Sequence, residues 1–194
     1  LKSNDELIIS DDGSTDNTIN ILNSYKDSRI KIYHSNKKNI ILNFQNALQN
    51  ASGEVIFLSD QDDIWMEDKV RKTLPLLNNY LLVFSNAIIF KEKPNDSKKL
   101  LFNKNSKNLE GFKNIYKNNY IGATMAFQAK LLKRSLPFPA AIPMHDSWLG
   151  LMANCLGKTF YIKDPLIFYR RHENNNSMTG EKSKYSLSKQ LSFR

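Results

Sequence analysis

The sequence predicts an α/β protein in which helices cover a mostly parallel sheet. Apolar runs typical of strands alternate with helix-like stretches through the first half of the chain, and this alternation is typical of parallel strands joined by helices. The chain has 194 residues, of which 41% are hydrophobic and 24% are charged. That length and balance predict one folded domain with its own core, and they exclude a disordered tail or a disulfide-stapled mini-protein.

The first half is expected to contain strands and helices in alternation. The strands cover residues 6–10, 30–33, 55–59 and 81–90, and the helices cover 15–25, 42–51 and 67–78. Ser14 or Asp16 can cap the first helix, and Gly53 is a natural stop after the second. Pro75 falls inside the third helix and predicts that this helix kinks or ends early, because proline lacks the backbone N–H that a helix interior needs.

The second half follows a polar stretch. Residues 91–107 are rich in Lys, Asn, Ser and Pro and are expected to form an exposed excursion. Beyond it we expect a helix at 111–117, a strand at 124–128, a helix at 146–156 and strands at 159–162 and 166–169. The expected organisation is a single domain over 1–177, with halves at 1–90 and 108–177, and a basic tail at 178–194. That tail either is solvated or lies on an anionic membrane surface.

The chain carries an excess of positive charge. Lys and Arg number 28 against 19 Asp and Glu, which gives a net charge of +9. An anionic partner is therefore expected, and charge alone does not choose among a nucleotide, a lipid surface, a phosphorylated substrate and nucleic acid. Cys155 is the one cysteine, which excludes an internal disulfide and a multi-cysteine zinc site. No apolar run approaches the roughly 20 residues of a membrane span, so neither a transmembrane helix nor a signal peptide is expected.

Carboxylates directly follow two of the predicted strands. Asp11 and Asp12 come after the first strand, and Asp60, Asp62 and Asp63 come after the third. In open α/β sheets ligands bind beyond the carboxyl ends of the strands, so both clusters are expected at one pocket. Clustered carboxylates stay ionised only beside positive charge, and Mg²⁺ or Mn²⁺ suits oxygen ligands that leave room for substrate phosphates. The alternative is that both clusters are ordinary Asp-rich turns.

Four separated motifs carry a resemblance to a known family. Residues 11–16 read DDGSTD, 51–65 read ASGEVIFLSDQDDIW, 145–148 read HDSW and 169–175 read YRRHENN. In this order they resemble family 2 glycosyltransferases of the GT-A fold, and the last two are similar to the bacterial rhamnosyltransferase-like branch. The resemblance covers residues 7–177 and implies a GT-A-like, Rossmann-like sheet with a mixed C-terminal acceptor half. Family members carry one more strand and helix ahead of the first motif, so the sequence is expected to be truncated at its N-terminus.

The resemblance implies a nucleotide-sugar site with a divalent ion. Asp12 matches the carboxylate that meets the nucleotide base, and Gly122 falls in a glycine-containing loop near the donor. Asp60 and Asp62 match the Asp-x-Asp signature, with Asp62 as the direct metal ligand and Asp60 placed toward the ribose or the metal. Asp63 would lie behind them. The implied cofactor is Mg²⁺ or Mn²⁺.

Two further residues take roles from the same resemblance. Asp146 matches the catalytic base, and His172 matches a late histidine that reaches the metal or the diphosphate. A carboxylate across the sugar from the leaving group can take the acceptor's proton in a one-step displacement that inverts the anomeric carbon. The alternatives are an ordinary helix N-cap for Asp146 and a surface position for His172. His145 is expected only to help position its neighbour.

The resemblance implies an inverting glycosyltransferase that moves a sugar from a UDP- or dTDP-linked donor to a saccharide or lipid-linked acceptor in cell-surface polysaccharide synthesis. Whether the truncated chain is active is left open. No nucleic-acid partner is expected, and the expected location is the cytoplasm, with a peripheral position at the inner face of the membrane as the alternative. Two other interpretations stay open: a Mg²⁺-dependent nucleotidyl or phosphoryl transferase, and a non-enzymatic basic module that binds polyanions.

Overall fold

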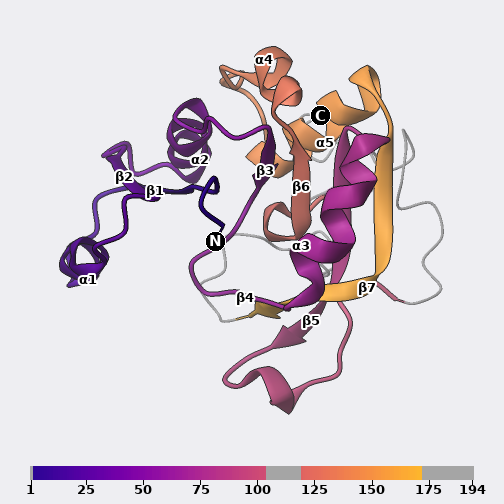
Figure 1. Cartoon of the computed structure of the whole chain (residues 1–194), viewed down its shortest axis with the longest axis horizontal. Coiled ribbons are helices and arrows are strands. Elements are labelled where there is room, and N and C mark those ends of the chain that lie inside the picture. Colours follow the sequence, from indigo (N-terminus) through magenta and orange to yellow (C-terminus); the bar gives the residue numbers. More distant parts are fainter. Residues whose placement is uncertain (1, 104–118, 172–194) are drawn as a thin grey trace.

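The computed structural model describes residues 2–103 and 119–171 (Figure 1). The expected helix at 111–117, the basic tail at 178–194 and His172 lie outside these residues. The described chain forms two sheets that are not hydrogen-bonded to each other. None of the helices in this part of the chain has the length and hydropathy that a membrane span requires.

The smaller sheet holds the first two predicted strands. β1 (Leu7–Asp11) and β2 (Ile30–His34) pair in parallel, with α1 (Thr18–Ser24) between them and α2 (Ile40–Gln49) after them. The N-cap of α1 is Asn17, so the prediction that Ser14 or Asp16 caps this helix is wrong, although Asp16 accepts a hydrogen bond from the Thr18 backbone at 3.0 Å. This β-α-β unit agrees with the alternation read from the sequence.

The larger sheet has the strand order β3-β6-β5-β7-β4. Its strands are β3 (Val55–Phe57), β4 (Ile64–Trp65), β5 (Leu82–Phe90), β6 (Met125–Gln128) and β7 (Thr159–Arg170). Only β5 and β7 pair in parallel, and the other neighbours are antiparallel. The α/β class is confirmed, but this sheet is mixed, where the sequence predicts mostly parallel strands. Antiparallel neighbours need no helical crossover, and the alternation of the first half gave no sign of them.

β7 runs unbroken through residues 163–165, where the sequence predicts a gap between two strands. Pro165 cannot donate a ladder hydrogen bond, and the pairing with β5 shifts register on both sides of Asn86, which lies opposite Pro165. A bulge absorbs an irregular residue and lets the strand continue. The predicted gap is therefore wrong, because β7 takes up the extra residues around Pro165 as a bulge while β5 continues residue by residue.

Pro75 ends the third helix early, as the sequence predicts. α3 (Asp68–Thr73) is α-helical, and the chain then tightens into a 3₁₀ turn, η1 (Leu74–Asn78), with the proline near its start. Proline is tolerated in a first turn because its missing N–H would have no helical partner there.

The core lies on both faces of β5. Along this strand Leu82, Val83 and Phe84 are fully buried, and successive side chains point to opposite faces of the sheet. Leu82 and Phe84 belong to a large cluster that includes α5 (His145–Leu156), whereas Val83 belongs to a smaller cluster that includes η1. A strand buried on both faces gives a continuous apolar run in the sequence, which explains why β5 is predicted well.

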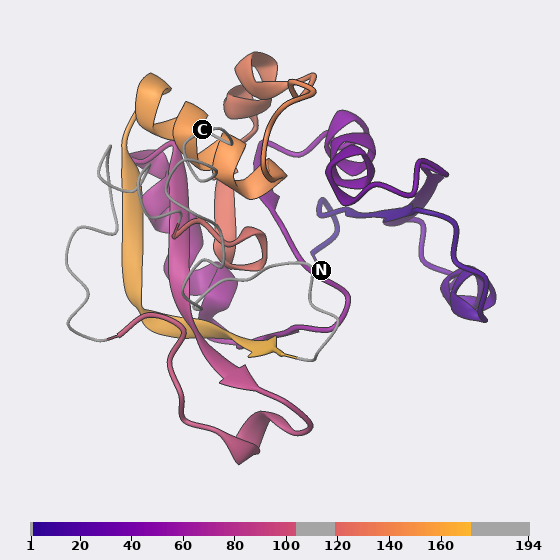
Figure 2. The same ribbon diagram turned by 180° about the vertical axis from the view of Figure 1, so that it is seen from behind.

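The smaller sheet lies to one side of the larger one and meets it through α2 (Figures 1 and 2). Phe44 on α2 stacks on His145 with ring centroids 3.8 Å apart. Gln45 accepts a hydrogen bond from the Phe138 backbone at 2.6 Å. These two contacts set the position of α2 against the start of α5.

The packing of α5 on the core depends on Gly150. An added Cβ at Gly150 would lie 2.1 Å from the ring of buried Tyr120. We expect Gly150→Ala to lower the free energy of unfolding by about 2 kcal/mol, because overpacking outweighs the better helix propensity of alanine. Urea unfolding measures this change. Gly53→Ala is the matched control, since its added Cβ meets its nearest atom at 3.5 Å; equal stability of the two variants would contradict the packing.

Candidate active site

An acidic loop, residues 60–63, follows β3. Leu58 is buried and donates its backbone N–H to Met125 at 3.2 Å, so the loop starts from a fixed point. Burial first, and the charge of Asp62 second, raise the pKa of Asp60 to about 6. Because like charges disfavour ionisation in a partly buried place, the loop favours the approach of a cation.

Arg170 at the end of β7 holds the acidic loop. Its backbone N–H donates to Asp63 at 2.8 Å, and its guanidinium donates to the Asp62 carbonyl at 3.0 Å and lies 4.5 Å over the Phe90 ring. Burial raises the pKa of Asp63. Its second carboxylate oxygen is buried and has no hydrogen-bond partner among the described residues. Arg170 therefore fixes the shape of the loop, and one carboxylate oxygen of Asp63 remains without a hydrogen-bond donor among the described residues.

Asp146 lies in the first turn of α5. The N-cap of this helix is Met144, so the alternative that Asp146 is an ordinary N-cap is wrong. The Asp146 carboxylate accepts hydrogen bonds from the backbones of Gly122 at 3.2 Å and Ser147 at 2.6 Å. Burial raises the pKa of Asp146 to about 6, and the charge of Asp60 adds to the shift. Geometry agrees, because a Cβ at Gly122 would lie 3.8 Å from Asp146 and 3.8 Å from Leu58, two residues before Asp60.

Gly122 opens a single 3₁₀ turn, η4 (Gly122–Thr124), beside Asp146. A Cβ at Gly122 would lie 3.0 Å from Nε2 of His145, so the missing side chain lets the histidine ring approach. His145 is 4% exposed, and neither ring nitrogen has a hydrogen-bond partner in the described ranges. Burial lowers the pKa of His145 to about 3. The ring is therefore neutral and acts by packing against Phe44.

Lys69 is a site residue that the sequence analysis did not single out. Its side chain is 1% exposed, and Nζ donates to the Ala123 carbonyl at 2.6 Å and lies 4.6 Å over the Trp65 ring. Burial lowers the pKa of Lys69, and the charges of the acidic loop oppose that shift. Lysine is almost always exposed unless paired. The signal that could have found it is its spacing from Thr73, which places both residues on the buried stripe of α3.

Asp12 follows β1 directly, at the end of the smaller sheet. Its carboxylate accepts hydrogen bonds from the backbones of Lys37 at 2.8 Å, Lys38 at 2.9 Å and Asn39 at 2.6 Å. These bonds order the turn before α2, in which Lys38 has a positive φ of 49°. A role for Asp12 at a nucleotide base stays a prediction.

The structure brings Asp60, Asp62, Gly122 and Asp146 together beside the larger sheet. Asp12 belongs to the other sheet, and His172 lies outside the described residues. The sequence prediction that both acidic clusters share one pocket stays a prediction, because the described contacts connect Asp146 with the second cluster and none of them connects the two clusters.

The acidic loop fits a divalent ion as a partial site. Within residues 2–103 and 119–171, no three acidic, histidine or cysteine side chains are arranged to hold a metal ion by themselves. Asp60 and Asp62 supply hard oxygen donors whose charges repel each other. Mg²⁺ commonly binds through one or two carboxylates together with substrate phosphates. The donor set thus suits an ion whose coordination the substrate completes.

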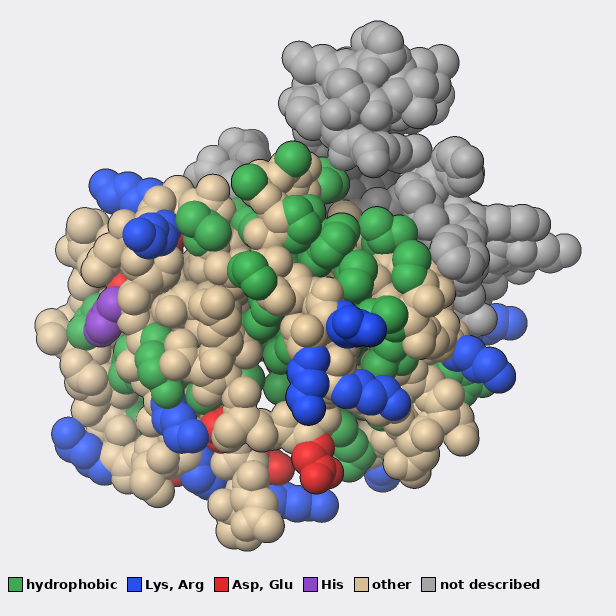
Figure 3. Space-filling model, turned by 90° about the horizontal axis from the view of Figure 1, so that it is seen from above, with side chains coloured by type: hydrophobic (Ala, Val, Ile, Leu, Met, Phe, Trp, Pro, Cys, Tyr) green, Lys and Arg blue, Asp and Glu red, His purple; other side chains and the backbone are tan. Residues whose placement is uncertain are grey.

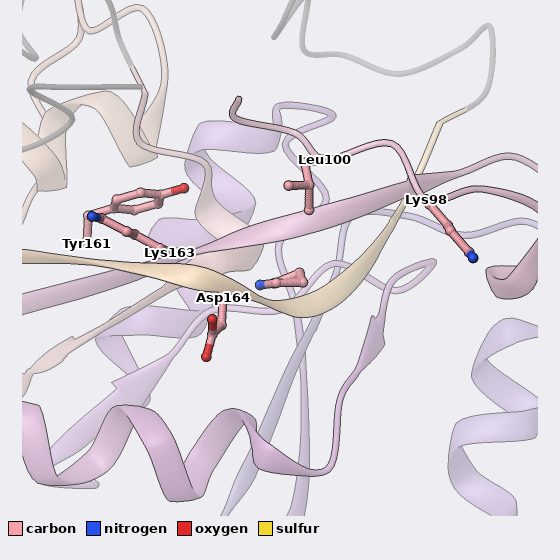
Figure 4. Close-up of a pocket in the computed structure, with 6 residues that line it drawn as sticks. Lys98, Leu100, Tyr161, Lys163 and Asp164 are labelled. Atoms are coloured by element: carbon pink, nitrogen blue, oxygen red, sulfur yellow. The ribbon is translucent and has the colours of Figure 1, made fainter. Parts of the chain in front are cut away.

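A separate cavity of about 490 Å³ lies beside the middle of β7. It is lined by Lys98, Leu100, Tyr161, Lys163, Asp164 and Pro165. Figure 4 shows Asp164 directed to the opposite side of the strand from Leu100, and the Asp164 carboxylate pairs with Lys72 at 2.8 Å. None of the candidate site residues lines this cavity, so the chemistry assigned to them does not involve it.

A mixed α/β sheet with an acidic loop after one strand and a carboxylate on a facing helix is the arrangement of a GT-A glycosyltransferase. The model of the family described as "Glycosyl transferase family 2" matches residues 1–136, and the chain belongs to this family. The match includes the acidic loop and Gly122, whereas Asp146 lies beyond it.

Two bacterial relatives carry names of transferases. The dTDP-rhamnosyl transferase RfbG of Shigella flexneri is 31% identical over 187 residues, which cover 87% of this chain and 63% of that protein. The UDP-Glc:alpha-D-GlcNAc-diphosphoundecaprenol beta-1,3-glucosyltransferase WfaP of Escherichia coli is 36% identical over 91 residues, which cover 46% of this chain and 36% of that protein. This chain therefore spans less than two thirds of the length of either relative.

Solved structures show the same fold. TarS 1-349 of S. aureus in complex with UDP-GlcNAc superimposes with a TM-score of 0.64 at 16% identity, covering 92% of this chain and 52% of that one. The mannosyltransferase PcManGT of Pyrobaculum calidifontis, in complex with GDP-Man and Mn²⁺, has a TM-score of 0.62 at 19% identity, covering 88% and 49%. Sequence identities this low establish the fold and leave donor choice open.

The raised pKa of Asp146 has a consequence for stability. Its value of about 6, against an ordinary 3.8, means that the folded protein holds a proton more tightly than the unfolded chain. The buried, ionised Asp146 carboxylate therefore destabilises the folded protein. This effect is absent below about pH 4 and complete above about pH 6. Asp146→Asn is expected to raise the free energy of unfolding by up to about 3 kcal/mol at pH 7 and by much less at pH 4.

Urea unfolding of metal-free protein at the two pH values measures this difference. Asp68→Asn is the matched control, because its hydrogen bond with Arg71 lowers the pKa of Asp68 and no such gain is expected. An equal gain for Asp146→Asn at both pH values would show that the carboxylate is not destabilised by burial.

Proposed function

We propose that this chain transfers a sugar from a nucleoside-diphosphate donor to a hydroxyl of a saccharide or lipid-linked acceptor, with inversion at the anomeric carbon, in the synthesis of a cell-surface polysaccharide. The observation that carries the proposal is the position of Asp146 beside Gly122, which donates its N–H to that carboxylate at 3.2 Å and whose added Cβ would lie 3.8 Å from Leu58, two residues before the acidic loop. The donor base is proposed to be uracil or thymine, because the relatives are named for UDP-Glc and dTDP-rhamnosyl transfer.

Asp146 is the proposed general base. Its carboxylate takes the proton of the acceptor hydroxyl as that oxygen bonds to the anomeric carbon. The bond from this carbon to the donor phosphate oxygen breaks in the same step, and its electron pair leaves on the nucleoside diphosphate. The backbone N–H groups of Gly122 and Ser147 hold the carboxylate in place. A pKa of about 6 keeps Asp146 mostly ionised at neutral pH and basic enough to accept the proton.

Asp62 is proposed as the direct ligand of Mg²⁺ or Mn²⁺, with Asp60 beside it and Asp63 behind. When bound, a divalent ion supplies Lewis-acid stabilisation of the departing diphosphate. The Mn²⁺ in the complex of PcManGT supports a metal-dependent reaction. Asp12 is proposed to meet the nucleotide base and His172 the diphosphate or the metal, on the strength of the motifs that contain them.

Asp62→Asn tests the metal site. Removing one charged ligand is expected to weaken Mn²⁺-dependent binding of UDP or dTDP at least about tenfold, because a hard cation depends on ionised oxygen ligands. Titration calorimetry with UDP, dTDP and GDP, each with and without Mn²⁺, measures this and ranks the bases. Asp68→Asn, an exposed carboxylate on α3, is the control. The proposal is wrong for Asp62 if the variant binds the nucleotide with Mn²⁺ as tightly as the wild type does.

We also propose that the protein works at the cytoplasmic face of the membrane, because WfaP is named for a diphosphoundecaprenol substrate. The basic-apolar segment, residues 129–144, suits that surface. It includes α4 (Leu132–Ser135), has three cations and no acidic residue, and leads directly into α5 and Asp146. Its exposed side chains are those of Lys130, Lys133, Arg134, Pro137, Pro139, Ala140, Ala141 and Pro143.

Figure 3 looks down on the α4 end of the molecule and shows hydrophobic and basic side chains next to one another there. Basic residues beside apolar ones favour contact with anionic lipid. A membrane on this side would present a lipid-linked acceptor close to the proposed base. The segment therefore supports a peripheral position for the protein.

Charge reversal of the basic-apolar segment tests this position. The triple variant Lys130→Glu, Lys133→Glu, Arg134→Glu is expected to lose at least about tenfold in affinity for vesicles containing phosphatidylglycerol, since each cation contributes about 1 kcal/mol near such a surface. Vesicle sedimentation measures the binding. The matched control reverses Lys91, Lys93 and Lys99, which are exposed in the connection after β5. An equal loss of vesicle affinity in both triple variants would show that net charge alone attracts the protein to the membrane. That result would refute a specific role for the basic-apolar segment.

A further inference from the structure

Lys69 links the two parts of the candidate site. Its ammonium donates to the Ala123 carbonyl at 2.6 Å. Ala123 lies in η4, whose first residue, Gly122, donates its N–H to Asp146 at 3.2 Å. On the other side, its Nζ lies 4.6 Å over the ring of Trp65, two residues after the acidic loop. The charge of Lys69 acts on Asp60 and Asp63 in that loop. One buried cation therefore contacts the turn that holds the proposed base and offsets negative charge in the acidic loop.

An ammonium in this place needs compensation. Removing it from water is strongly unfavourable unless carbonyls, rings or carboxylates take the place of the water. For Lys69 the Ala123 carbonyl, the Trp65 ring and the acidic loop do so. Lys72, three residues further along α3, is partly exposed and pairs with Asp164 at 2.8 Å. α3 thus carries one lysine, Lys72, that is partly exposed to solvent and another, Lys69, that is buried at the candidate site.

We infer that Lys69 is a positioning residue that offsets the charge of the acidic loop before the metal and diphosphate bind, and that it holds η4 so that Asp146 keeps its place. The inference rests on the proposed function. The ammonium and a divalent ion are attracted by the same carboxylates and repel each other. Lys69 therefore weakens metal binding while it improves the geometry of the base. Removing its charge should strengthen metal binding and slow sugar transfer.

Lys69→Met separates the two effects, because it removes the charge and keeps an unbranched side chain that is one heavy atom shorter. Calorimetric titration with MnCl₂ alone at pH 7 is expected to show Mn²⁺ binding at least about threefold tighter than in the wild type. The kcat for sugar transfer is expected to fall at least about tenfold, with the donor KM changed less. Lys72→Met is the matched control and is expected to change neither. Unchanged or weaker Mn²⁺ binding in Lys69→Met overturns the inference, since a packing role alone predicts that result.

Melting without metal tests the charge balance independently. Lys69→Met is expected to melt about 5 °C or more below the wild type, because it leaves buried carboxylates uncompensated. Adding Asp63→Asn to Lys69→Met is expected to restore at least half of the loss, since the second change removes the uncompensated charge. No recovery in the double variant overturns the inference.

The double variant also covers the case in which Lys69→Met alone does not fold. Folding of the double variant then supports the charge balance, and its failure to fold overturns it. These melting measurements need no sugar transfer. A protein whose Lys69 and Asp63 couple as described but which transfers no sugar would refute the proposed function and leave the charge balance intact.

Discussion

Mutual repulsion among carboxylates is the constraint on which this site depends. Asp60, Asp62 and Asp146 lie where β3 ends and α5 begins. Burial raises the pKa of Asp60 and of Asp146, so both carboxylates are harder to ionise. Arg170 and Lys69 reach the acidic loop from two further elements, β7 and α3. All of these elements surround the doubly buried strand β5. The rigid core therefore holds these carboxylates close together, although their like charges repel one another.

Features with a strong local signal could be predicted from the sequence. The apolar run of β5, the helix end at Pro75 and the carboxylates after β3 each depend on residues that are neighbours in the chain. The family motifs added Asp146, whose role no local pattern distinguishes from capping. The structure then showed that Met144 takes the cap position. Local chemistry and motif order together predicted the fold class and the residues that meet at the candidate site.

Features that depend on distant partners could not be predicted in this way. The two-residue strand β4 exists because it pairs with β7, and β7 continues past Pro165 as a bulged strand because β5 pairs with it on both sides of the bulge. Lys69 is buried against the general tendency of lysine, and its partners are an acidic loop and a turn from separate parts of the chain. For Asp12, the backbone groups it accepts from lie more than one element away. Pairing of this kind leaves no periodic pattern in the sequence.

The close approach of Gly122 to His145 makes three positions interdependent. The histidine ring has its face on Phe44 and its edge against the glycine. A side chain at 122 would push the ring toward α2, and a smaller residue at 44 would make room for that shift. Substitutions at these positions should therefore be tolerated in combination more readily than singly. Among relatives of this chain, drift at one of the three positions would be recorded as covariation among α2, η4 and α5.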